Sequence, residues 1–216
     1  MLRLCPNLEQ LEATDLWGSH ELFYLPSISL VKLDYLEVWP GEDPEWGIQN
    51  IFINNLKTIF QVVPNLTRLR LFEPGVCHDM GLTLSHVTSL DLSSSCMDEE
   101  SMDNLLRACS RLERLRLSDH EHSGRYGSTF TPMEAAHSVL EHTPSLKNFH
   151  LDISNCEFKE SRFEGPEGAF TLWEEFESPR RKLTARGIEF TYDSIILHEY
   201  FELYSDTGDQ YSDTVV

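Results

Sequence analysis

The feature that most constrains the fold is a short apolar phrase that occurs twice, as VTSLDL at 87–92 and as LERLRL at 112–117. Apolar residues spaced by two are typical of a strand with one buried face. The stretch between the copies, at 99–109, has the apolar period of an amphipathic helix. Each strand and helix leaves an apolar surface that only a neighbouring copy can bury, so the pattern predicts an array of stacked units.

The same alternation of helix and strand recurs along most of the chain. An apolar helical end, a Pro or Ser, and the first Leu of a strand follow one another at 2–11, 60–69, 106–115 and 140–149. Proline cannot continue a helix and therefore ends it before the strand. Aligning the third apolar position of each predicted strand gives seven residues, which are Ala13, Val38, Leu71, Leu92, Leu117, Leu151 and Phe190.

The intervening helices are expected at 46–63, at 99–109 with Asp98 as N-cap, and from Thr131-Pro132 to His142. The stretch 172–186 also has a helical pattern, although Pro179 should break or kink it. A last strand is predicted at 187–192.

The fold class expected from these patterns is α/β, with about seven irregular repeats over 1–192. A capping helix is expected at 193–204, and a disordered acidic tail at 205–216. The chain begins inside a repeat without a polar cap, so we expect Met1 to start a truncated product or a fragment of a longer protein.

The formal net charge of -19 argues against a nucleic-acid or anionic-membrane surface. It favours basic or neutral protein partners, and solubility is the simpler explanation. The five cysteines are scattered without a C-x-x-C pair, which favours a reducing compartment, cytoplasmic or nuclear. No apolar run is long enough for a signal peptide or a membrane span.

The phrases LLRACSRLERLRL at 105–117 and MLRLCPNLEQL at 1–11 resemble leucine-rich repeats of the ribonuclease-inhibitor type. They are similar to the repeat region of F-box leucine-rich-repeat proteins, particularly a filamentous-fungal group. The resemblance implies a solenoid with a concave parallel sheet and convex helices. It also implies substrate recognition in a Skp1–cullin–F-box ubiquitin ligase. No F-box stretch occurs in this chain, so no Skp1-binding residue is assigned, and Skp1 is an expected partner only if an F-box lies upstream.

Side chains alternate along a strand, so the residues between the core positions should point to the concave face. These are the candidate residues for binding a protein partner: Tyr35, Glu37, Trp39, Arg68, Arg70, Phe72, Asp91, Arg114, Arg116 and His150. The middle positions should form a row across the sheet, which is Glu12, Glu37, Arg70, Asp91, Arg116, His150 and Glu189.

Two interpretations of this row remain open. The arginines and nearby aromatic side chains could form a basic spot for a partner's carboxylates, because such residues anchor interfaces. Alternatively, Glu37, Arg70, Asp91 and Arg116 form a cross-strand salt-bridge ladder of little net energy. Arg68 and Arg114 have no opposing acid in their row, so we expect them to be the pair available to a partner.

Other chemistry-bearing motifs are weaker. His120 and His122 have an H-x-H spacing that could hold a metal, but a polar loop is the simpler interpretation. Cys77-His78-Asp79 is too local for triad geometry. We therefore expect a monomeric, non-enzymatic module without metal or cofactor. The alternatives are a free-standing scaffold or inhibitor that binds a basic protein, and an enzyme that uses the His120/His122 loop.

Overall fold

A computed structural model describes residues 7–14, 30–39, 57–72, 84–93, 99–118, 132–152 and 177–193. Each strand is five residues long, and the seven are β1 (Gln10–Thr14), β2 (Tyr35–Trp39), β3 (Arg68–Phe72), β4 (Ser89–Ser93), β5 (Arg114–Ser118), β6 (Asn148–Asp152) and β7 (Glu189–Asp193). The helices are α2 (Glu99–Ala108) and α3 (Pro132–His142), and residues 57–62 and 177–185 are also helical.

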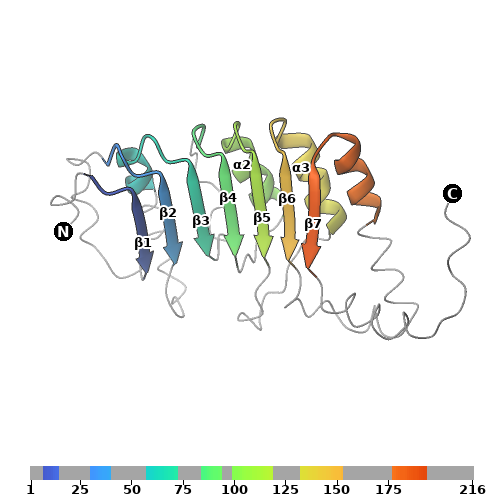
Figure 1. The fold of residues 1–216 in the computed structure, drawn as a ribbon, viewed down its shortest axis with the longest axis horizontal. Helices are drawn as coiled ribbons and strands as arrows, with labels where there is room; N and C mark the ends of the chain where they lie inside the picture. The colour runs from blue at the N-terminus through green and yellow to red at the C-terminus, as the bar shows by residue number, and fades with distance from the viewer. Residues whose placement is uncertain are drawn as a thin grey trace, which may run out of the picture.

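The seven strands form one parallel sheet in which their spatial order is their order in the chain (Figure 1). The predicted α/β class is therefore confirmed. Each strand is in register with the next, so that the apolar residue at its second position faces that of its neighbour. This row is Leu11, Leu36, Leu69, Leu90, Leu115, Phe149 and Phe190.

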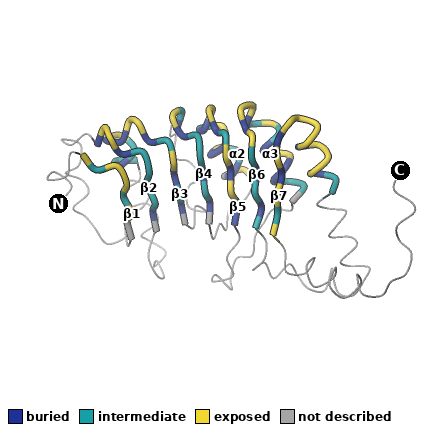
Figure 2. Tube along the Cα trace, in the orientation of Figure 1, coloured by how far each residue is buried: buried dark blue, intermediate teal, exposed yellow. Residues whose placement is uncertain are grey.

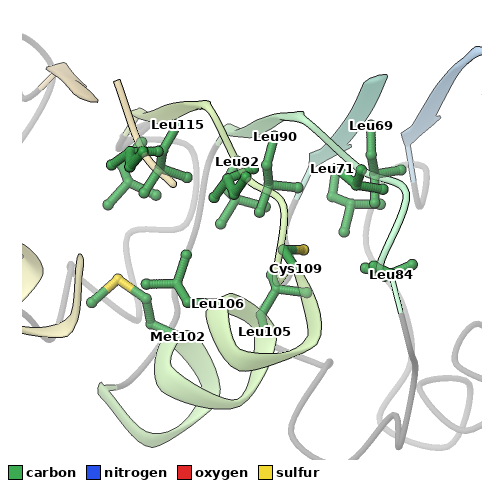
Figure 3. Packing of buried hydrophobic residues seen from close by; sticks show 14 of the residues in the cluster. Leu69, Leu71, Leu84, Leu90, Leu92, Met102, Leu105, Leu106, Cys109 and Leu115 are labelled. Carbon is green, nitrogen blue, oxygen red and sulfur yellow. The ribbon is translucent and has the colours of Figure 1, made fainter. Parts of the chain in front are cut away.

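The core lies on one face of this sheet. Leu90, Leu92 and Leu115 are at most 2% exposed, and Met102 and Leu106 of α2 are 0% exposed. Figure 3 shows the strand leucines facing the apolar side of α2. Burying a side chain of this kind contributes about 1.5–3 kcal/mol, so stacking of neighbouring units supplies the stability that one strand and helix lack.

A hydrogen-bonded turn precedes most strands. In each case an amide donates to the carbonyl three residues earlier, as from Leu66 to Val63 at 3.3 Å and from Leu112 to Cys109 at 3.1 Å. Pro64 occupies the second position of the first of these turns, where its fixed φ is favourable. The turns therefore place the strands that follow them at a common level in the sheet.

The same turns are joined to one another across the sheet. The carbonyl of Thr67 accepts from the amides of Thr88 and Ser89, at 2.8 and 3.0 Å. The carbonyl of Thr88 accepts in the same way from the amides of Glu113 and Arg114. These paired bonds fix the register at the amino-terminal end of each strand.

Several predicted boundaries are confirmed. The helix expected at 99–109 is α2, which ends one residue earlier at Ala108, and α3 begins at Pro132 and ends at His142 as expected. Of the helix expected at 46–63, the described part is 57–62. Asp98, Thr131, the expected capping helix after residue 193 and the expected tail at 205–216 lie outside the described residues.

Two predictions near the last strand are wrong. Tyr192, not Phe190, faces Leu151, so the last strand aligns two residues later than expected and extends to Asp193. The physical reason is Gly187, whose φ of 79° turns the chain after the helix and sets where the strand begins.

Pro179 does not break the helical segment 177–185, and its side chain is buried. The fixed φ of proline, about −65°, is compatible with a helical backbone, so Pro179 removes one backbone donor without ending the segment. None of the helices in the described ranges is long and apolar enough to cross a membrane.

Candidate protein-interaction face of the sheet

The candidate site is the sheet surface opposite the core, called here the polar face. It consists of the first, third and fifth residues of each strand. Burial alternates in this way along β6, whereas Ser118 at the end of β5 is buried (Figure 2). All ten candidate residues occupy such positions. The side chains of Trp39 and Phe72 lie outside what the structure describes, so only their strand positions are established.

The first cluster on the polar face holds Arg68. Its Nη2 lies 3.1 Å from Asp34 Oδ1, and its guanidinium carbon lies 5.1 Å from the ring centre of Tyr35. Asp34 comes just before β2, outside the row of strand positions. The expectation that Arg68 is available is therefore wrong, because an acid from the preceding turn pairs with it.

A second cluster confirms part of the predicted ladder. Arg70 lies between Glu37 and Asp91, with N–O distances of 3.7 and 3.5 Å, and faces both in the strand register. The Tyr35 hydroxyl also donates to Glu37 Oε2, at 2.5 Å. Burial, and then the neighbouring Glu37 carboxylate, raise the pKa of Tyr35 to about 12.

The third cluster lies toward β7. Arg116 Nη2 is 3.3 Å from Asp152 Oδ2, and His150 Nε2 is 3.5 Å from Asp193 Oδ2. The other ring nitrogen of His150 is 2.9 Å from the hydroxyl oxygen of Thr191. Thr191 ends the middle row in place of the predicted Glu189, which instead accepts a hydrogen bond from Asn148.

Arg114 differs from the other arginines of the polar face. It is exposed at the first position of β5, between Ser89 and Asn148. Its guanidinium forms no ion pair or hydrogen bond with any other residue of the described ranges. The prediction that Arg114 has no acidic neighbour in its row is confirmed, since its row partners are neutral.

Sequence reasoning missed Asp34 and Asp193 as members of this face. Asp193 lies two residues after Thr191, at the fifth position of β7, so strand alternation places it on this face. The predicted strand ended at residue 192 and therefore did not include it. Asp34 gave no strand-period signal because it precedes β2 and follows the turn that Leu33 closes with Leu30. His120, His122 and Cys77 lie outside the described residues.

The arrangement is suited to recognition. It combines the exposed Arg114, the ion pairs of the other arginines, and a buried apolar core on the opposite side of the sheet. Comparison of the chain with protein-family models, with curated proteins and with solved structures gives no match.

Proposed function

We propose that the chain is a non-catalytic protein-interaction module built of leucine-rich repeats, whose polar face is the concave side of a solenoid. The seven sequential parallel strands and the in-register apolar row support this architecture. Stacked repeats present an extended surface to partners. The partner segment expected here carries a carboxylate or a short acidic loop.

The observation that carries this proposal is the exposed Arg114. Its guanidinium has five donors in a planar fork, which match both oxygens of one carboxylate. Arg68, Arg70 and Arg116 already have acidic neighbours, so a partner would have to displace those contacts. Arg114 can form a bidentate ion pair with a partner's carboxylate without first losing a contact with an acid of its own chain.

The experiment begins with a photo-reactive residue in place of Ser89, the register neighbour of Arg114, to identify the partner by cross-linking. The affinity is then measured for the native chain and for Arg114→Glu. Reversing one member of an interfacial charge pair costs about 2–5 kcal/mol, a weakening of about 30-fold or more. The matched control is Arg181→Glu, which makes the same charge change on the helical segment 177–185. Equal affinities for the two variants would contradict a site at Arg114.

The more specific role that we propose is substrate recognition for an F-box-type ubiquitin ligase. It rests on the resemblance of the repeat phrases. The test is co-purification of the full-length gene product with Skp1, which this role requires. A full-length product that binds its partner through Arg114 but does not bind Skp1 would remove the ligase role and leave the interaction role intact.

The alternative is a free-standing scaffold or inhibitor that binds a basic protein, which the net charge of -19 favours. The two functions predict opposite effects of the same variant. Arg114→Glu weakens binding of an acidic segment and strengthens binding of a basic one. The scaffold also predicts steep weakening as salt rises, because its long-range attraction is screened.

A further inference from the structure

Three side chains with metal-ligating atoms meet on the polar face at the carboxyl ends of β6 and β7. They are His150, Asp152 and Asp193, and one ligand atom from each lies within 4.8 Å of the other two. We propose that they form a binding site for a divalent cation of the zinc type. This site is independent of the partner proposed for Arg114.

The strand register supports the site. Asp152 and Asp193 are direct neighbours across the β6–β7 pair, and like charges in that position destabilise a sheet. The side chain of Asp152 is only 14% exposed, so water screens its charge incompletely. Arg116, 3.3 Å from Asp152 Oδ2, offsets part of this repulsion, and a divalent cation between the two carboxylates would offset the rest.

The orientation of His150 is a second, independent observation. Its Nδ1 lies 2.9 Å from the hydroxyl oxygen of Thr191, its register neighbour on β7. Its Nε2 is 3.5 Å from Asp193 Oδ2. Metal-ligating histidines are typically held in this way, with one ring nitrogen on an outer partner and the other on the metal.

The donor set determines the class of metal. Calcium and magnesium prefer oxygen ligands alone, whereas imidazole with carboxylates suits zinc, cobalt or nickel. Ligand atoms about 2.0–2.2 Å from a tetrahedral zinc lie roughly 3.4 Å apart, so atoms that now lie within 4.8 Å of one another have to close by up to about 1.4 Å. Asp193 can make this movement because its side chain is 64% exposed. The fourth position would be left to water.

Arg116 competes with the metal for Asp152. Its guanidinium supplies a positive charge 3.3 Å from the Oδ2 atom that would bind the cation. Replacing Arg116 by Gln removes that charge, so it should strengthen metal binding. A gain of affinity is useful as a test because partial unfolding of a variant cannot produce it.

The test uses the full chain, freed of metal with a chelator and titrated with zinc chloride in a calorimeter and with cobalt(II) in a spectrophotometer. The native chain should bind one zinc ion, with cobalt absorption bands characteristic of nitrogen and oxygen ligands. His150→Ala and Asp193→Asn should each weaken zinc binding by at least about tenfold, and Thr191→Val by about 10–100-fold. Arg116→Gln should bind zinc several-fold more tightly than the native chain.

Two controls separate this site from the other histidines. His137→Ala removes an exposed imidazole from α3 and should leave zinc affinity unchanged. The double change His120→Ala/His122→Ala should also leave it unchanged. The proposal is overturned if the native chain does not bind zinc, if His150→Ala and Asp193→Asn bind as the native chain does, or if the His120/His122 variant loses the site.

Discussion

Arg68 and Tyr35 face each other across the β2–β3 pair, with the guanidinium carbon of Arg68 5.1 Å from the ring centre of Tyr35. The same guanidinium bonds both carboxylate oxygens of Asp34, at 3.1 and 3.2 Å. Arg68 is thus held by two neighbours, whereas Arg114 at the equivalent position of β5 contacts neither an acid nor a ring in the described structure. Equivalent strand positions therefore have different surroundings on this face.

This difference predicts unequal costs of removing the two arginines. Arg68→Ala should lower the free energy of unfolding by about 0.5–2 kcal/mol, from the lost cation–π contact and the lost ion pair. Arg114→Ala should change it by less than about 0.5 kcal/mol. Urea unfolding followed by circular dichroism measures both. Equal losses for the two variants would show that the contacts of Arg68 contribute nothing.

Tyr35 should make stability depend on alkaline pH. Burial and the Glu37 carboxylate raise the pKa of Tyr35 to about 12, from an ordinary value of 10.0. Its protonated form is therefore favoured by folding, and this contribution is complete below pH 10 and is lost as the pH rises from 10 to 12. Absorbance at 295 nm should show a late-titrating tyrosine that Tyr35→Phe removes.

The neighbouring carboxylate offers a control for that titration. Glu37→Gln removes the negative charge and should bring the pKa of Tyr35 closer to its ordinary value, while the shift caused by burial remains. If Glu37→Gln leaves the late titration unchanged, the hydrogen bond and charge of Glu37 do not raise the pKa of Tyr35.

Leu92 should be critical for folding because its side chain is 0% exposed beneath the sheet. Leu92→Ala should cost about 2–5 kcal/mol, from lost burial and the cavity left behind. Leu92→Asp should prevent folding, since it adds an unpaired buried charge. The control is Val31→Ala, at a turn position that is 50% exposed, with an expected change within about 0.5 kcal/mol. A stable Leu92→Asp variant would contradict the stacked core.

Cys109 should be unreactive in the folded chain. Its side chain is 0% exposed, and burial raises its pKa to about 12, so neither access nor thiolate is available at neutral pH. Iodoacetamide should leave the peptide containing Cys109 unmodified until urea is added, as mass spectrometry of the digest can show. Labelling of Cys109 without urea, at the rate of a free thiol, would be inconsistent with this packing.

The sequence was sufficient to predict the strands because their signal is local and strong. A period of two with Leu at fixed spacing predicted the buried face of six strands, and the resemblance to leucine-rich repeats predicted their parallel order. The same pattern gave the wrong alignment for β7, because Phe190 and Tyr192 are both aromatic and each fits the third core position. The choice depends on the backbone at Gly187, which an apolar pattern does not encode.

The sequence predicted which residues lie on the polar face, but not which of them form ion pairs with one another. Alternation placed Arg70 and Arg116 on one surface, but a long side chain can reach diagonal as well as direct neighbours. Arg116 faces His150 in the register and yet contacts Asp152, two residues farther along. Arg68 likewise reaches Asp34, which precedes β2, because its side chain is long. Which acid an arginine selects is decided by side-chain reach in three dimensions.

The shared turn bonds before the strands have a consequence for how such a chain can diversify. Because paired bonds such as those to Thr67 and Thr88 fix neighbouring strands at one end, the stretches of chain between consecutive strands can differ in length, from 16 residues at 73–88 to 36 at 153–188, while the strands stay in register. Insertions after a strand are therefore expected to leave the register of the strands unchanged.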